Sequence, residues 1–209
     1  MKINTYSQEE YLEQLKAFHG SMAPGLIIGG AMVNLALKVL PKDKLFDAIC
    51  ETPLCLPDAI QLLTPCTIGN GWLTVLNFGR FAITLYEKYS GVGVRIYLDS
   101  AKLKQYPEVY SWYFKLKTKP EQDFQLLISQ IKEAKEQILS LQHIRVQPES
   151  LRRKKIGPVA DCPECGECYP IRDGLSCRAC QGASPYVEVD TPELVGMSLN
   201  IAATESQAT

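Results

Sequence analysis

The sequence carries almost no net charge. Its 209 residues include 22 lysines and arginines against 23 aspartates and glutamates, which gives a formal charge of −1. Proteins that attract nucleic acid or anionic membranes over long distances usually carry a surplus of positive charge. Net charge therefore indicates neither partner, and only the basic cluster LRRKK at 151–155 keeps nucleic acid as an alternative.

The chain also has no clean membrane-spanning stretch. Its longest apolar run, residues 23–40, is interrupted by Asn34 and Lys38 and is shorter than the roughly 20 apolar residues that a span needs. The first 14 residues are polar and acidic, unlike the basic start and apolar run of a secretory signal. We therefore expect a cytoplasmic protein with no membrane partner, in which residues 23–40 form a buried helix.

What is present suits one or two folded domains, since 46% of the residues are apolar and 22% are charged. Ser7 and Glu10 match a capping box and predict a first helix over residues 8–18, ended by Gly20. Pro24 is well placed in the first turn of the second helix. A strand is expected at 45–51, a short helix at 57–63, and an antiparallel meander of strands at 71–78, 81–89 and 93–99.

A further helix is predicted over residues 121–142. Its apolar residues alternate in three- and four-residue steps, the spacing of a helical seam. They are Phe124, Leu127, Ile131, Ala134, Ile138 and Leu141. An amphipathic helix on the body of the domain is the favoured interpretation, with a coiled coil between two chains as the alternative.

These elements predict an α+β fold, an antiparallel sheet packed with helices, over a core domain at residues 1–145. Residues 146–160 form a basic linker in which charge, proline and glycine replace apolar periodicity. A four-cysteine module follows at 161–183, and residues 184–209 form a tail with no clear fold signal.

The module contains two C-x-x-C pairs eleven residues apart, Cys162 with Cys165 and Cys177 with Cys180. Each pair lets one tight turn direct two thiolates at one ion, and four thiolates close the shell of a structural zinc. We therefore predict a zinc ribbon or treble clef with Cys168 left free, and a hairpin between the two pairs that turns at the RDG sequence, residues 172–174. Iron in a rubredoxin-like site is the alternative.

Upstream, His19, Cys55 and Cys66 are candidates for a second site. His19 is also explained by the dipole of the helix that it ends, and both cysteines by simple burial. Cys66 lies in the turn-rich sequence TPCTIGNG, where backbone amides would lower the pKa of its thiol.

Two motifs resemble the FmdE family of formylmethanofuran dehydrogenase proteins. His19, Gly20, Pro24, Gly25 and Leu26 match its first motif, H-G-H-x-C-P-G-L. The second motif is matched in register by Cys55, Asp58, Ala59, Ile60, Gln61, Thr64, Cys66, Thr67, Gly69 and Gly71. The resemblance covers residues 10–98 and 160–182. It implies an α+β core that is usually dimeric, a pocket lined by His and Cys, and a treble-clef zinc finger.

The chain departs from these motifs at four positions. Ser21 and Ala23 stand where the family has a histidine and a cysteine, and Pro65 and Asn70 replace Gly and Lys. His19, Cys55 and Cys66 remain as a candidate core site for a soft metal such as zinc. The alternative, which the sequence allows equally, is a pocket that keeps the family's shape but has lost its metal-binding or catalytic activity.

The resemblance favours a metal-binding accessory or interaction protein linked to one-carbon or molybdenum metabolism, and so related to methanogenesis. Zinc is its expected cofactor, and a homodimer and subunits of a larger redox complex are its expected partners. One alternative is a stand-alone enzyme that uses a His/Cys metal site in the core pocket on a small one-carbon or pterin-type substrate. His19 would be a base or a metal ligand there, and Cys66 a nucleophile or a metal ligand. The other is a zinc-finger regulator that contacts nucleic acid.

Overall fold

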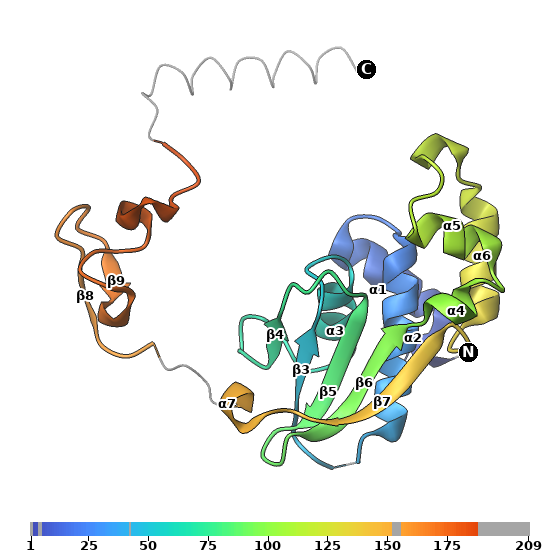
Figure 1. Cartoon of the computed structure of the whole chain (residues 1–209), viewed down its shortest axis with the longest axis horizontal. Coiled ribbons are helices and arrows are strands. Elements are labelled where there is room, and N and C mark those ends of the chain that lie inside the picture. Colours follow the sequence, from blue (N-terminus) through green and yellow to red (C-terminus); the bar gives the residue numbers. More distant parts are fainter. Residues whose placement is uncertain (1, 4–5, 42, 152–155, 188–209) are drawn as a thin grey trace. The chain divides into compact units, whose positions relative to one another are not determined.

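The computed structural model describes residues 2–3, 6–41, 43–151 and 156–187 (Figure 1). The chain forms two compact units, Met1–Arg152 and Arg153–Thr209. The first contains a five-stranded sheet with helices, and the second contains the cysteine module. Residues 152–155 of the basic cluster and the tail from residue 188 lie outside the described residues. Among the described helices, none is both long and apolar enough to cross a membrane.

The first helix begins as the sequence predicts. Short strands β1 (Lys2–Ile3) and β2 (Tyr6–Ser7) precede α1 (Gln8–His19). The Glu10 N–H donates to Ser7 Oγ at 3.2 Å and the Ser7 N–H donates to Glu10 Oε2 at 2.7 Å, which confirms the capping box. Gly20 ends α1 with a φ of 82°, a conformation that glycine adopts without strain.

The second helix, α2 (Pro24–Val39), is mostly buried. Its glycines permit close packing: a Cβ on Gly29 would lie 2.8 Å from Ala59 Cβ, and one on Gly30 would lie 2.5 Å from the Tyr11 ring. Ala59 belongs to α3 (Leu56–Leu63), so α2 packs tightly against both neighbouring helices.

The sheet has the strand order β4-β3-β5-β6-β7. Its strands are β3 (Phe46–Cys50), β4 (Leu73–Val75), β5 (Ala82–Glu87), β6 (Val92–Leu98) and β7 (Leu139–Arg145). All neighbours are antiparallel except β3 and β4, which are parallel. The α+β class is confirmed, and the sheet is mixed rather than wholly antiparallel.

The predicted three-strand meander is therefore half right. β5 and β6 form a hairpin, but β3 lies between β4 and β5. After β4 the chain folds over the end of β3, where the Leu76 N–H donates to the Cys50 carbonyl and the Phe78 N–H donates to the Glu51 carbonyl. Because of these bonds, residues 76–81 do not form a tight hairpin turn between β4 and β5.

The predicted helix over 121–142 is wrong beyond its first half. Helix α6 (Phe124–Ala134) ends where Lys135 takes a φ of 48°, and β7 follows. Ile138 and Leu141 fit a helical seam, but pairing β7 with β6 over seven residue pairs satisfies the backbone of both strands. Sheet pairing outweighed the local helical pattern.

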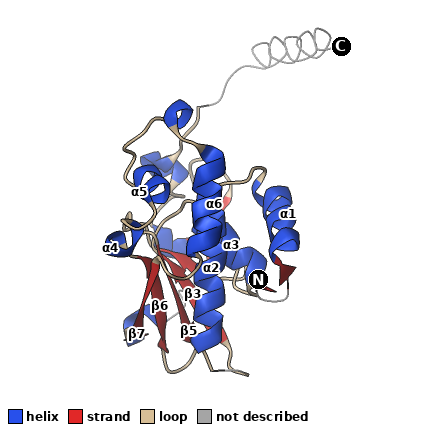
Figure 2. Ribbon diagram, turned by 90° about the vertical axis from the view of Figure 1, so that its right-hand side faces the viewer, coloured by secondary structure: helices blue, strands red, loops and turns tan. Residues whose placement is uncertain are grey.

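Helices α2 and α3 lie against one face of the sheet, and α1 and α6 pack against these helices on the same side (Figure 2). The core between them includes the fully buried Leu26, Met32, Ile60, Ile83 and Ile96. The remaining elements of this unit are α4 (Ser100–Leu103), α5 (Pro107–Tyr113), the 3-10 turn η1 (Lys119–Glu121) and α7 (Pro148–Leu151).

The cysteine module has its own small fold. Strand β8 (Val159–Asp161) pairs antiparallel with β9 (Cys168–Pro170), so the first C-x-x-C pair forms the connection of this hairpin. The 3-10 turn η2 (Ile171–Asp173) and the π-helical segment η3 (Ala179–Ala183) follow. The predicted hairpin around 172–174 is thus wrong, because the RDG sequence forms η2 and its end instead.

Candidate functional site

The second unit brings four cysteines together. The Sγ atoms of Cys162, Cys165, Cys177 and Cys180 all lie within 4.8 Å of one another. The Cys165 and Cys177 Sγ atoms are 3.7 Å apart. Zinc–sulfur bonds of about 2.3 Å in a tetrahedron require sulfur atoms about 3.8 Å apart. The cluster therefore fits a zinc ion with four thiolate ligands.

Backbone amides support negative charge in this cluster. The Cys177 N–H donates to Cys162 Sγ at 3.3 Å and the Cys180 N–H donates to Cys177 Sγ at 3.4 Å. A hydrogen bond donated to a sulfur atom favours its thiolate form. The pKa of Cys162 is lowered to about 6, and the hydrogen bond from the Cys177 N–H is the main cause. Gly166, at a φ of 78°, closes the first turn because its N–H donates a hydrogen bond to the Cys162 carbonyl.

Cys168 stands apart from the four. It is exposed at the start of β9, and its thiol donates to Asp161 Oδ1 at 3.5 Å. The Asp161 carboxylate raises the pKa of this thiol. Cys168 is thus held as a neutral thiol outside the metal set.

In the first unit, His19 is paired with an acid. Its Nδ1 lies 2.6 Å from Asp58 Oδ2, with both side chains about a quarter to a third exposed, at 26% and 31%. The carboxylate orients the imidazole and favours a proton on Nδ1. His19 therefore joins the end of α1 to the first turn of α3.

Cys55 lies beside the same helix end. It is the N-cap of α3 with a φ of 58°, and a Cβ on Gly25 would lie 3.0 Å from its Sγ. Burial, with a contribution from the Asp58 charge, raises the pKa of the Cys55 thiol. Cys55 is neutral in this setting.

Cys66 lies in different surroundings. It is fully buried, and its thiol donates to the Phe46 carbonyl at 3.5 Å. Burial raises the pKa of this thiol to about 11, which is opposite to the lowering expected from the turn-rich sequence. Among the described residues, the four cysteines of the module are the one set of His, Cys, Asp or Glu side chains whose ligand atoms lie close enough together to hold a metal ion. His19, Cys55 and Cys66 do not form such a set.

Asn70, one of the departures from the family motif, has a structural role. Its side-chain oxygen accepts hydrogen bonds from the Thr67 and Trp72 N–H groups, at 3.1 and 2.9 Å. Its amide nitrogen donates to the Pro65 carbonyl at 2.7 Å. These bonds fix the loop that carries Cys66.

A cavity of about 410 Å³ opens beside Cys55. It is lined by Gly25, Thr52, Leu54, Cys55, Gly79, Arg80, Phe81, Trp112, Tyr113 and Lys115. Volumes of roughly 300–1,000 Å³ are typical of small-molecule sites. The lining combines a thiol, three aromatic rings and two cations, and it includes neither His19 nor Cys66.

Glu51 anchors one wall of this cavity. Its carboxylate, 5% exposed, accepts from Arg95 Nε and Nη2 at 2.6 and 2.8 Å and from Arg80 Nε at 2.7 Å. The hydrogen bonds from Arg95 are the main reason that the pKa of Glu51 lies below its usual value. A buried acid thus holds the exposed Arg80 in place.

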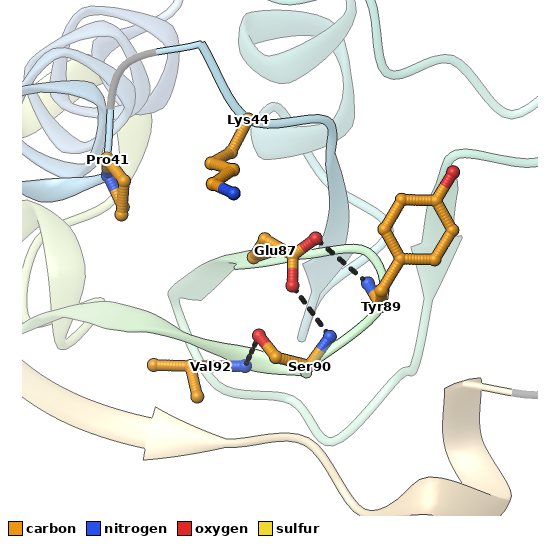
Figure 3. Close-up of a pocket in the computed structure, with 6 residues that line it drawn as sticks. All are labelled: Pro41, Lys44, Glu87, Tyr89, Ser90 and Val92. Atoms are coloured by element: carbon orange, nitrogen blue, oxygen red, sulfur yellow. Dashed lines mark hydrogen bonds between the residues drawn. The ribbon is translucent and has the colours of Figure 1, made fainter.

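A second concavity lies at the β5–β6 turn (Figure 3). Glu87 accepts hydrogen bonds there from the Tyr89 and Ser90 N–H groups, at 3.2 and 2.6 Å, and Ser90 Oγ accepts from the Val92 N–H. These groups are used to close the turn, so this hollow has a structural role.

The family can now be assigned. Residues 18–146, more than half of the chain, match the family model described as "FmdE, Molybdenum formylmethanofuran dehydrogenase operon". The chain belongs to the FmdE family. Residues 153–187 match the FmdE treble clef zinc finger, which agrees with the geometry of the four cysteines and with zinc as their metal.

Two relatives extend this result. The protein in a crystal structure from Syntrophus aciditrophicus, described as a "tungsten formylmethanofuran dehydrogenase subunit e (fmde)-like protein", is 52% identical to this chain. The TM-score is 0.82, and the match covers 89% of this chain and 98% of that one. A protein of Archaeoglobus fulgidus named "Probable S-adenosyl-L-methionine-binding protein" is 28% identical over 82% of this chain. The chain spans about half (52%) of that archaeal protein.

The sequence thus predicted the zinc module and its FmdE membership, and both are confirmed. It missed the aromatic and cationic residues of the core cavity, because no spacing rule links residues 25, 52–55, 79–81 and 112–115.

Proposed function

We propose that the chain is a cytoplasmic, zinc-bearing accessory protein that associates with enzymes of one-carbon or molybdenum metabolism. The four-cysteine cluster carries this proposal. A closed set of four thiolates leaves no ligand position for a substrate, so its zinc would hold a small docking unit in shape rather than perform chemistry. The family model and the Syntrophus relative supply the link to formylmethanofuran dehydrogenase.

Binding to the purified catalytic subunits of a formylmethanofuran dehydrogenase tests this association. Native mass spectrometry should detect a complex with the wild-type chain, and none with Cys177→Ser, which removes one zinc ligand. Cys168→Ser is the matched control and should still bind. Absence of a complex with the zinc-loaded wild type would overturn the proposal.

We also propose that the core forms a homodimer. Exposed apolar side chains directly follow β4, an edge strand of the sheet: Leu76 and Phe78 are 38% and 57% exposed. Apolar surface at a strand edge favours association with a second chain. Light scattering after size exclusion should give twice the chain mass, and Phe78→Glu should give a monomer. A monomeric wild type at micromolar concentration would exclude the homodimer.

A stand-alone enzyme remains as an alternative, and the His19–Asp58 pair favours it. Such a pair can orient a general base. Cys66, buried and with a raised pKa, offers no support as a nucleophile. Metal analysis separates the two functions: zinc in the module alone gives one ion per chain, whereas a loaded core site gives about two. Under the enzyme hypothesis, His19→Gln should lower the metal content from about two ions per chain towards one.

Binding of S-adenosyl-L-methionine is a second candidate function, suggested by the name of the archaeal relative. The core cavity favours it, since its aromatic rings can pack against an adenine. Isothermal titration calorimetry with S-adenosyl-L-methionine should give a one-to-one complex that Trp112→Ala weakens. No heat of binding at about 1 mM ligand would exclude this candidate.

A further inference from the structure

We propose that the core cavity selects a small, flat heteroaromatic molecule that carries a carboxylate or phosphate group. The ring would pack against Trp112, Tyr113 and Phe81, and the anionic group would bind Arg80 and Lys115. This proposal goes beyond the zinc-dependent role. It rests on the second candidate function for the cavity and for the packing of a flat ring against its aromatic side chains, and it adds the binding of an anionic group by Arg80 and Lys115.

The aromatic lining argues for a flat ligand. The Phe81 and Tyr113 rings lie 6.1 Å apart at 77°, and the Trp112 and Tyr113 rings lie 6.2 Å apart at 48°. The planes of the three rings are therefore tilted relative to one another, so the cavity is lined by both ring faces and ring edges. A planar π-system can meet such a lining through stacked and edge-to-face contacts together.

The charges of the lining argue for an anionic group. Arg80 and Lys115 are its two charged residues, and none of the ten lining residues is an aspartate or glutamate. The Arg80 side chain is 58% exposed, while its Nε is fixed by Glu51. Because Arg95 also binds Glu51, one carboxylate faces two guanidinium groups and the cluster keeps a positive charge. A positioned guanidinium suits a carboxylate or phosphate.

The backbone at this cavity is strained at two places. Cys55 and Lys115 have φ values of 58° and 56°, and both line the cavity. Among the described residues, two others that are not glycine, Asp43 and Lys135, have a positive φ. A positive φ is unfavourable for a residue with a side chain, and strain of this kind concentrates at functional sites. Two strained residues from separate loops at one cavity indicate that its shape is maintained for a ligand.

Gly25 and Cys55 keep the cavity open on its remaining side. A Cβ on Gly25 would lie 3.0 Å from Cys55 Sγ and 3.4 Å from Phe81 Cζ, and so would narrow the space between them. Cys55 is a neutral thiol because burial raises its pKa. It therefore adds no negative charge that would repel an anion.

Four probes separate the ring from the anionic group. Calorimetry on the zinc-loaded full-length chain would compare adenosine 5′-monophosphate and pterin-6-carboxylate with adenosine and ribose 5-phosphate. At least one ring-bearing anion should bind at least about tenfold more tightly than both controls, since a charge-assisted hydrogen bond contributes at least that much. The preferred one distinguishes phosphate from carboxylate.

Variants then place the ligand. Arg80→Gln and Lys115→Gln should each weaken binding at least about tenfold, and Arg80→Lys should recover part of the loss. Lys104→Gln, which removes an exposed lysine that does not line the cavity, should bind as wild type. In a Trp72→Phe background Trp112 is the sole tryptophan, and its fluorescence should change as the ligand binds.

Three results would overturn the inference: no binding of either ring-bearing anion at about 1 mM, equal affinity for adenosine, or unchanged affinity in both Arg80→Gln and Lys115→Gln. Zinc content and melting temperature, measured on every variant, separate such a result from a misfolded chain. Failure here would leave the zinc-dependent association untouched, because that proposal is tested by complex formation.

Discussion

The two units of this protein are stabilised in opposite ways. The core buries a continuous apolar cluster that extends from Tyr11 to Leu139. Among its described residues, the module buries an apolar cluster of three, Cys162, Tyr169 and Cys177, and two of them belong to the metal set. Each fully buried large apolar side chain contributes about 1.5–3 kcal/mol, so the core can fold on burial alone. The module has no such reserve, and its fold must depend on the metal.

Removing a zinc ligand should have the largest effect on this contrast. Cys177→Ser should abolish zinc binding and unfold the module, because zinc supplies about 10–16 kcal/mol in comparable peptides. The core should keep its melting transition. Elemental analysis and amide hydrogen exchange check both units, with Cys168→Ser as the control that retains zinc. A folded module in metal-free Cys177→Ser would contradict the contrast.

A cavity in the core should have the reverse effect. Leu26 is fully buried, so Leu26→Ala should lower the free energy of unfolding of the core by about 2–5 kcal/mol. Zinc content should stay at one per chain. Urea unfolding monitored by tryptophan fluorescence reports the core alone, because Trp72 and Trp112 both lie in the first unit. Leu45→Ala, at a site 55% exposed, is the control and should change little.

The Glu51 cluster gives the core its own pH dependence. Its hydrogen bonds with Arg95, then the charges of Arg95 and Arg80, hold the pKa of Glu51 below the usual 4.5. The unfolded chain therefore binds this proton more readily, so the stabilisation is present above pH 4.5 and is lost as the pH falls through the folded pKa.

Glu51→Gln should remove this component. The variant should be less stable than wild type at neutral pH, and the difference should shrink as the pH falls below about 4.5. Urea titrations of both proteins at several pH values, followed by tryptophan fluorescence, measure it. A difference that stays constant down to about pH 3 would show that Glu51 titrates normally.

The smallest predicted effect concerns the end of α1. Ser7→Ala removes the acceptor for the Glu10 N–H and should lower the free energy of unfolding of the core by about 1 kcal/mol. Ser7→Gly should lower the same free energy by only a few tenths of a kcal/mol. Urea unfolding resolves the two variants, and equal loss in both would argue against the cap.

Local signals account for what the sequence predicted. Ser7, Gly20 and Pro24 mark helix ends through bonds within a few residues, and the cysteine spacing places four thiols at one ion. Strand order is not local. The parallel pairing of β4 with β3 and the change from α6 to β7 depend on which distant backbone supplies a partner. Only the family resemblance, and no local pattern, had implied a pocket in the core.

The candidate core site shows the same limit. Cys55 and Cys66 are eleven positions apart, yet Cys55 lines the cavity while Cys66 is enclosed beneath the Phe46 carbonyl. Arg80 reaches the cavity because Glu51, nearly thirty residues earlier, holds its guanidinium. Such contacts arise from the packed sheet rather than from any interval along the chain.

A diffraction map recorded at the zinc absorption edge tests the central claim most directly. We predict one zinc peak per chain in the module, enclosed by the sulfur atoms of Cys162, Cys165, Cys177 and Cys180. A module that is folded with these four thiols reduced and no metal between them would contradict the account.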